Sequence, residues 1–269
     1  MAMSPTDRVV LFLIDGLRGD ALGKVHTPHL DRLIARGAST TAARSLMPNC
    51  TLPCHTSIFF GVPPERHGIV TNTFTPFVRP VRGLIETITT AGGACAMFHN
   101  WEQLRDLSPP GHLKTSIFHQ LPQGDLSAGD RAVAQSATDW LGSNSWNFAF
   151  IYLGATDEVG HRHGWMSDEY LVAFAIADQC IGQVLPSLGE QTTVIVTADH
   201  GGHARTHGTD CDEDMLIPFI ISGPNVPAGA TVNTPFDLVD FAPSIVRALG
   251  VTPDANWTGQ PATYRSADT

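Results

Sequence analysis

Five short apolar runs, spaced along the whole chain, restrict its fold more than any other feature of the sequence. They occupy residues 9–15, 94–100, 147–153, 193–199 and 217–223. Continuous apolar runs of this length are typical of parallel strands that are buried on both faces. Amphipathic stretches that we predict to be helices lie between them, at residues 26–37, 170–189 and 237–250. This alternation predicts an α/β fold, with a mainly parallel sheet and helices on both of its faces.

The first of these helices shows the local signals most clearly. We expect Thr27 to cap it, Pro28 to occupy its first turn and Gly37 to end it. The region 105–130 is rich in proline and glycine, and we predict that it is an excursion on the surface. Because the sequence has no repeat and no linker, we expect residues 1–269 to form a single domain without a large cap domain.

Composition narrows the classes of partner. A formal charge of -10 disfavours duplex nucleic acid and an anionic membrane surface. The apolar run near the N-terminus is about six residues long, too short for a signal peptide or a membrane span. We therefore expect a soluble cytoplasmic protein whose five scattered cysteines are reduced thiols. An oligomer is compatible with the sequence.

Potential metal ligands gather where the predicted strands end. In open α/β sheets, ligands bind beyond the carboxyl ends of the strands. Asp157 and His161 are four residues apart, so both side chains would project from the same face of a helix. His163 is offset by two residues and should point elsewhere. The full set of candidate ligands is Asp15, Asp157, His161, Asp199, His200 and His207.

Three carboxylates and three imidazoles predict two divalent metal ions. Mixed oxygen and nitrogen donors suit zinc, with manganese or iron as alternatives. Singly, each residue is explained equally well as a turn aspartate or a surface histidine, but their concentration at strand ends favours a metal centre. Six ligands are too many for one tetrahedral ion and suffice for two, and a two-metal centre is a known device for phosphoryl transfer. Two cations would also let an acidic protein bind an anionic substrate.

Thr51 is the candidate nucleophile. It lies just before Leu52 and Pro53, and a predicted helix follows. A hydroxyl at a helix N-terminus is close to free backbone N–H groups that can hold a phosphate, and a neighbouring metal would lower its pKa. Two alternatives stay open: Thr51 could be an N-cap, and Cys50 and Cys54 are rival nucleophiles by chemistry.

A second polar residue completes the candidate catalytic set. The neutral amide of Asn72 could donate to a phosphoryl oxygen on which charge develops, although it could also be an ordinary turn residue. We expect Arg66 and His67 to serve the structure of their own loop. Nothing in the sequence selects Arg105 or Lys114 as contacts for the outer groups of a substrate.

The motifs that contain these residues resemble the alkaline phosphatase superfamily. The segments "VVLFLIDGLRGD", "HTPHLDRLIARGA", "NCTLPCHTSIFFGVPPERHGIVTN", "TDEVGHRHG", "VTADHGG" and "HGTD" are most similar to its nucleotide pyrophosphatase/phosphodiesterase branch. The resemblance implies an alkaline phosphatase-like fold. It also implies one zinc ion on Asp157, His161 and His207, and a second on Asp15, Asp199 and His200. The Thr51 hydroxyl would lie at the second ion as a ligand, and Asn72 would bind the phosphoryl group.

The same resemblance implies hydrolysis of a small phosphate ester or nucleotide-like substrate through a covalent phosphothreonine. The branch usually has Thr-Phe-Pro-Asn-His at the nucleophile, whereas this chain has Thr-Leu-Pro-Cys-His. Leu52 thus replaces an aromatic residue and Cys54 replaces an amide. The alternatives within the superfamily are a phosphomonoesterase, a phosphonate hydrolase and a phosphomutase. A sulfatase is disfavoured because threonine cannot become the aldehyde that sulfatases use and because His55 replaces their arginine. A non-catalytic metal-binding protein is the alternative from another class.

Overall fold

The computed structural model describes residues 7–266, and its central element is a nine-stranded sheet with the order β4-β3-β5-β1-β6-β7-β2-β8-β9. The strands are β1 (Arg8–Ile14), β2 (Ala38–Arg44), β3 (Cys95–His99), β4 (Leu113–Phe118), β5 (Phe148–Leu153), β6 (Thr192–Thr197), β7 (Leu216–Ser222), β8 (Ala230–Val232) and β9 (Tyr264–Arg265). Each of the five predicted strands overlaps one of these.

Most neighbouring strands in the centre of the sheet are parallel. Strand β1 lies between β5 and β6 and is parallel to both, so that Leu11 pairs with Phe150 on one side and Ile195 on the other. Strands β3 and β4 continue this arrangement. The predicted fold class is therefore confirmed. The run in β7 differs from the prediction, because it is antiparallel to β6 and to β2. An apolar run indicates only that a strand is buried on both faces. An antiparallel strand inside a covered sheet is buried in the same way, so the run does not reveal the direction of the strand.

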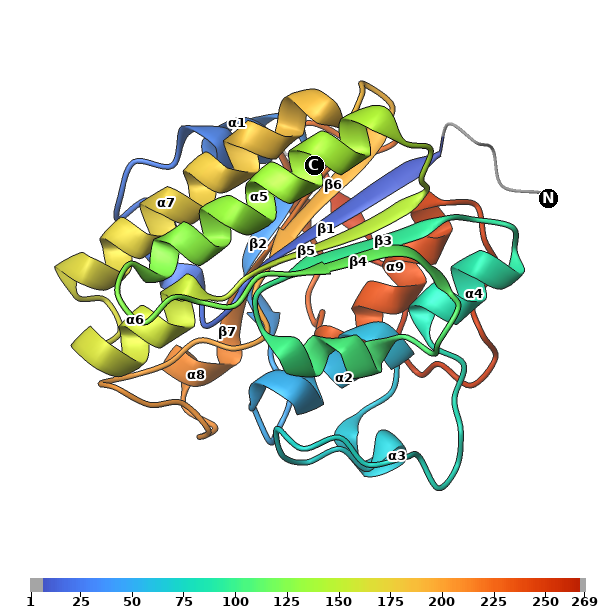
Figure 1. Cartoon of the computed structure of the whole chain (residues 1–269), viewed down its shortest axis with the longest axis horizontal. Helices are drawn as coiled ribbons and strands as arrows, with labels where there is room; N and C mark the ends of the chain where they lie inside the picture. Colours follow the sequence, from blue (N-terminus) through green and yellow to red (C-terminus); the bar gives the residue numbers. More distant parts are fainter. Residues whose placement is uncertain (1–6, 267–269) are drawn as a thin grey trace.

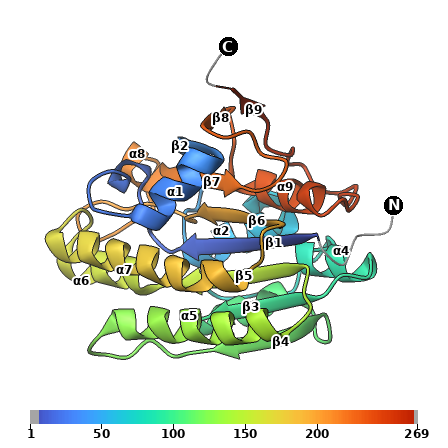
Figure 2. The same cartoon turned by 90° about the horizontal axis from the view of Figure 1, so that it is seen from above.

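Helices cover both faces of this sheet (Figure 1). One layer contains α1 (Pro28–Arg36), α5 (Leu126–Ser143), α6 (Ala155–His163) and α7 (Asp168–Val184). The opposite layer contains α2 (Thr51–Phe60), α4 (Leu84–Thr90) and α9 (Phe241–Ala248). The short helices α3 (Pro64–His67) and α8 (Asp212–Met215) lie in connecting loops. Figure 2 shows the same layers from above, with α5 and α7 side by side.

The double cover explains the composition of the central strands. Every residue of β1 from Val9 to Ile14 is fully buried, as are the residues of β5 from Phe148 to Ile151. Burying one such side chain contributes roughly 1.5–3 kcal/mol, so the centre of the sheet is the most stable part of the scaffold. The ends of these strands are therefore rigid positions for functional side chains.

Two local predictions were wrong. The region 105–130 is not only a surface excursion, because it contains the edge strand β4 and the start of α5. The alternating pattern of β4, with one side of the strand exposed, leaves no apolar run in the sequence. Thr27 occupies the N-cap position of α1, but its side chain makes no capping bond and its hydroxyl is buried without a partner in the described residues. The carboxylate of Asp178 instead accepts the backbone N–H groups of His29 and Leu30.

Across residues 7–266, no helix combines the length and apolar character required to cross a bilayer. All five cysteines lie in this range and are free thiols, as predicted.

Candidate metal centre and nucleophile

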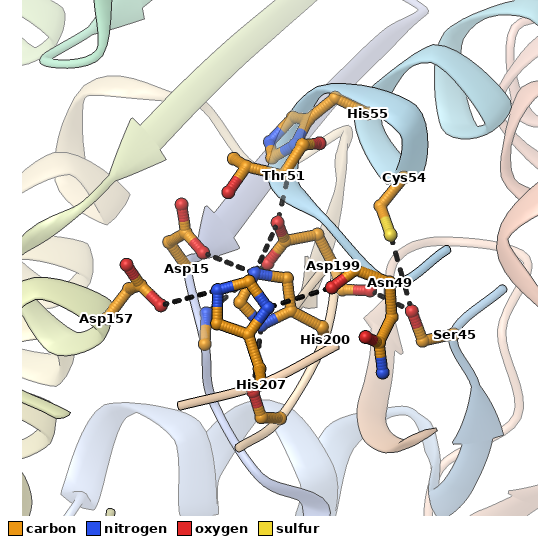
Figure 3. Close-up of polar contacts among 12 residues, drawn as sticks. Asp15, Ser45, Asn49, Thr51, Cys54, His55, Asp157, Asp199, His200 and His207 are labelled. Atoms are coloured by element: carbon orange, nitrogen blue, oxygen red, sulfur yellow. Dashed lines mark hydrogen bonds and ion pairs between the residues drawn. The ribbon is translucent and has the colours of Figure 1, made fainter. Parts of the chain in front are cut away.

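The carboxyl ends of β1, β5 and β6 meet at the same edge of the sheet, and the predicted ligands follow them there. Asp15 comes directly after β1, α6 begins two residues after β5, and Asp199 comes two residues after β6. His207 reaches the same place from the loop between β6 and β7. Figure 3 shows five of the six predicted ligands, with Thr51 above them on the first turn of α2.

Three of the predicted ligands form a first cluster, which we call the α6 triad: Asp157, His161 and His207. One ligand atom from each lies within 4.8 Å of the others. The Nε2 atom of His161 is 3.5 Å from one carboxylate oxygen of Asp157, and Nε2 of His207 is 3.9 Å from the other. The four-residue spacing on a helix therefore has the predicted effect of bringing Asp157 and His161 together.

The remaining three form the β1–β6 triad: Asp15, Asp199 and His200. Their ligand atoms also lie within 4.8 Å of one another. Nε2 of His200 is 3.4 Å from Oδ1 of Asp15 and 3.4 Å from Oδ2 of Asp199. Asp199 and His200 are adjacent in sequence, and the turn after β6 directs both side chains to the same point. The rings of His200 and His207 stack with their centroids 3.8 Å apart, so the two triads are in contact.

Each of the three imidazoles is oriented by a backbone carbonyl. Nδ1 of His161 donates to the Arg205 carbonyl at 3.0 Å. Nδ1 of His200 donates to Gly201 at 2.8 Å, and Nδ1 of His207 donates to Asn49 at 2.8 Å. A proton held on Nδ1 leaves the Nε2 lone pair free, and this is the arrangement that outer hydrogen bonds impose on metal-binding histidines.

Burial and mutual repulsion make the carboxylates of this site difficult to ionise without a cation. Burial, followed by the charge of Asp199, raises the pKa of Asp15 well above its usual range. Burial, followed by the charge of Asp15, does the same to the pKa of Asp157. Burial raises the pKa of Asp199 to about 7 and lowers the pKa of His207 to about 3. The site thus combines imidazoles with crowded acids, and a divalent cation would stabilise the acids in their deprotonated forms.

The residues present fit such cations. In the described part of the chain, four buried atoms of the two triads have no hydrogen-bond partner: Asp15 Oδ1, Asp157 Oδ1, Asp199 Oδ2 and His200 Nε2. Buried polar atoms are rarely left unpaired, and an absent ion is one of the accepted explanations. All four belong to residues predicted as ligands, and their nitrogen and oxygen donors suit zinc or a similar divalent metal.

Thr51 and Asn72 lie on the wall of a cavity of about 150 Å³ that residues of both triads also line. Thr51 is the first residue of α2 and is 6% exposed, whereas Cys50 occupies the N-cap position. Asn72 accepts a hydrogen bond from the backbone N–H of Leu52 through Oδ1, at 2.9 Å. That bond leaves the NH₂ group of Asn72 as the donor available to a substrate.

Sequence reasoning missed several residues that support this site. Tyr152 donates a hydrogen bond to Oδ2 of Asp15, and Trp165 donates to the carbonyl of Gly16 at 2.8 Å. Gly16 has a φ of 68°, and a Cβ atom there would lie 3.0 Å from Oδ1 of Asp157. Tyr152 belongs to the apolar run of β5, where its hydroxyl is the only polar side-chain group. That hydroxyl was the signal that could have identified it.

The departures from the branch's nucleophile motif do not reach the cavity. Leu52 and Cys54 are both fully buried, and neither lines the cavity beside Thr51. Burial raises the pKa of the Cys54 thiol well above its usual value, so it is a poor rival nucleophile. His55 is fully buried as well, with burial lowering its pKa to about 3.

The remaining polar residues singled out in the sequence lie outside the triads. As predicted, His163 faces away, 3.7 Å from Glu169, and Arg66 and His67 bond within their own loop, Arg66 to the carbonyl of Arg79 and His67 to the backbone N–H of Ile69. His67 also bonds the hydroxyl of Ser57 in α2. Arg105 pairs with Glu102, and Lys114 donates to the carbonyl of Ser145. None of these side chains lines the cavity beside Thr51.

A third group, His203, Cys211 and Asp214, also has ligand atoms within 4.8 Å of one another. Both carboxylate oxygens of Asp214 already accept hydrogen bonds, one from His203 and the other from Thr209. This group therefore braces the loop that carries His207.

Comparison with known proteins identifies the family of this chain. The family model for type I phosphodiesterase / nucleotide pyrophosphatase matches residues 9–83 and 96–213. Bis(5'-adenosyl)-triphosphatase ENPP4 of Homo sapiens is 27% identical over 237 residues, which cover 78% of this chain and 49% of that protein. Ectonucleotide pyrophosphatase/phosphodiesterase family member 3 of Rattus norvegicus is 24% identical over 271 residues, which cover 90% of this chain and 30% of that protein. The chain thus spans half or less of the length of these relatives.

Solved structures share the fold at lower identity. Murine ectonucleotide pyrophosphatase / phosphodiesterase 5, in an inactive form in complex with AMP, has a TM-score of 0.78 and 16% identity. The match covers 96% of this chain and 97% of that one. The 2-O GAG sulfatase BT1596 has a TM-score of 0.77 and 16% identity, and the match covers 95% of this chain and 73% of that one.

Proposed function

Because the chain belongs to the type I phosphodiesterase / nucleotide pyrophosphatase family, we propose that it hydrolyses phosphodiester or pyrophosphate bonds in small nucleotide-like substrates. The observation that supports this proposal most strongly is the convergence of the two triads on one cavity beside Thr51. The relative named as a bis(5'-adenosyl)-triphosphatase and the AMP complex of a structural neighbour point to the same class of substrate.

The two triads would each hold one divalent ion, with zinc as the metal that best suits their donors. When bound, such ions supply positive charge for the phosphate and lower the pKa of a neighbouring hydroxyl. In our proposal the Thr51 hydroxyl then attacks phosphorus and the bond to the leaving oxygen breaks. The leaving oxygen takes up the proton that the hydroxyl loses. Water subsequently hydrolyses the phosphothreonine, which restores the hydroxyl and releases a monophosphate.

The protein's own groups orient this reaction. Thr51 stands at the N-terminus of a ten-residue helix, where the helix dipole favours a phosphate. The bond from Leu52 N–H to Asn72 Oδ1 fixes the Asn72 side chain, so its NH₂ group can donate to a phosphoryl oxygen. Both contacts stabilise the charge that develops during the transfer.

Substituting the nucleophile tests the proposal. Thr51→Ala should lower turnover of bis(4-nitrophenyl) phosphate by roughly a thousandfold or more, because it removes the hydroxyl that forms the covalent intermediate. The variant should still bind two metal ions per chain, measured by elemental analysis of the purified protein. Thr51→Ser, which keeps the hydroxyl, is the matched control and should retain substantial activity. Full activity in Thr51→Ala would refute the assignment of the nucleophile.

A parallel assay separates the alternatives within the superfamily. Hydrolysis of 4-nitrophenyl phosphate and of its diester should be compared on the same metal-quantified protein. We expect the diester or a nucleotide anhydride to be preferred. A strong preference for the monoester would favour a phosphomonoesterase, and no turnover of any ester by the metal-loaded protein would favour a non-catalytic protein.

A further inference from the structure

A buried carboxylate outside the metal centre needs an explanation. Asp130 lies in the second turn of α5 and is fully buried. Its Oδ1 atom accepts a hydrogen bond from the side-chain amide of Asn100 at 2.7 Å and one from the backbone N–H of Ala155 at 3.3 Å. Its Oδ2 atom is buried and has no hydrogen-bond partner in residues 7–266. Such a group is costly to bury, so a compensating role is expected.

Asn100 extends the same arrangement to the neighbouring residue. It follows β3 directly and is 3% exposed. Its Oδ1 atom accepts the backbone N–H of Gly154 at 3.1 Å, while its NH₂ group donates to Asp130. The two side chains thus accept two successive N–H groups, those of Gly154 and Ala155. These belong to the N-cap and the first residue of α6, where the helix leaves N–H groups free and its dipole favours negative charge.

The fit around this turn is close. A Cβ atom on Gly154 would lie 2.8 Å from the ring of Tyr152 and 2.9 Å from Oδ1 of Asn100. The turn connects two residues of the metal centre. Tyr152, on one side, bonds Asp15, and Asp157 follows on the other side, in the first turn of α6. A shift of this turn would therefore move ligands of both triads.

We propose that Asn100 and Asp130 are positioning residues, which hold the start of α6 so that Asp157 and His161 meet His207 at one metal ion. This inference rests on the proposed function, since it assumes that the α6 triad binds a metal. The pair contacts neither the ligands nor the cavity, and acts through the backbone of Gly154 and Ala155. Burial raises the pKa of Asp130 to about 7, and either protonation state leaves Oδ1 able to accept both hydrogen bonds.

Exchanging the two side chains tests the inference. In Asn100→Asp alone, two carboxyl groups face each other and the donor between them is lost. We expect affinity for one of the two metal ions to fall by about tenfold or more, because the start of α6 and with it Asp157 would shift, an effect similar in size to the loss of an outer hydrogen bond to a ligand. The double variant Asn100→Asp/Asp130→Asn restores one amide and one carboxyl at the same distance. It should recover most of that affinity. Zinc binding to the metal-free protein is measured by competition with a chromophoric chelator, so the assay does not depend on catalysis.

Asp178 offers a matched control for general destabilisation. It is also a fully buried carboxylate at a helix start, and it accepts the N–H groups of His29 and Leu30 in α1, which carries no predicted ligand. Asp178→Asn should lower the melting temperature without changing either metal affinity by more than about threefold.

The outcomes distinguish the two proposals. If the unmodified protein binds no metal ion, the proposed function fails first. If it binds two ions and Asn100→Asp leaves both affinities unchanged, the positioning role is wrong while the metal centre stands. The positioning role is also wrong if the exchange variant is no better than Asn100→Asp, or if Asp178→Asn loses metal to the same extent.

Discussion

Removing the metal ions should make the stability of the protein depend on pH between pH 6 and 7. Asp199 is fully buried, and burial raises its pKa to about 7. In the unfolded chain the same carboxyl loses its proton near pH 4. Between these two pH values the folded, metal-free protein holds a proton that the unfolded chain has released. Its stability therefore falls as the pH rises, and the fall levels off only above the folded pKa.

The magnitude follows from that pKa. Between pH 6 and pH 7, a carboxyl with a folded pKa near 7 loses about 1 kcal/mol of stabilisation. Asp15 and Asp157 have pKa values raised in the same direction and should add to the loss. Burial lowers the pKa of His55 and His207 to about 3, which favours folding as the pH rises. Both imidazoles are neutral above pH 6 in the folded protein, with or without metal, so their contribution cancels when the loaded and the metal-free protein are compared.

Thermal melts of the metal-loaded and the chelated protein measure this effect. Bound cations keep the carboxylates ionised, so the loaded protein should not share the loss. Asp130, with a pKa also near 7, titrates in both forms and cancels in the comparison. The gap in melting temperature should widen from pH 6 to pH 7 by roughly 2–4 °C for each kcal/mol. A gap that stays constant or narrows would show that the carboxylates are not held as the structure describes.

Two further substitutions probe the supports of the centre. Gly16→Ala places a Cβ atom 3.0 Å from Asp157 Oδ1 in a left-handed backbone, and should reduce metal retention in dialysis. Gly23→Ala has a similar φ of 79° with no atom within 4 Å, so it should show only the strain of roughly 1–2 kcal/mol. Tyr152→Phe removes the donor to Asp15, and we expect calorimetry to show about tenfold weaker binding of one ion. Tyr264→Phe, in strand β9 at the far edge of the sheet, should leave both affinities nearly unchanged. Equal effects within either pair would contradict the reasoning.

The sequence contains enough information to predict the centre of the fold and the position of each candidate ligand. The apolar runs identify β1, β5 and β6, and the rule that ligands lie beyond strand ends places Asp15, Asp157 and Asp199 at the same edge of the sheet. Side chains that follow adjacent parallel strands meet at one edge, but the strand order that makes β5, β1 and β6 neighbours was not predicted and comes from the structure. The roles of these residues in metal binding and catalysis remain proposals, as do a single domain over residues 1–269 and a cytoplasmic location.

Elements without an apolar run were not predicted. Strand β2, with the sequence "ASTTAAR", consists mainly of small and polar residues, and β4 alternates at the edge of the sheet. The supporting contacts were equally hidden. Asn100 and Asp130 are 30 residues apart and meet only because β3 and α5 pack together. Such pairs are decided by tertiary packing, which no local pattern records.

The most direct test of the central claim is anomalous X-ray diffraction from crystals grown with zinc. The account predicts two peaks, one among Asp157, His161 and His207 and the other among Asp15, Asp199 and His200. The Thr51 hydroxyl should lie beside the second peak. A single peak, or peaks outside both triads, would contradict the two-metal centre from which the proposed chemistry follows.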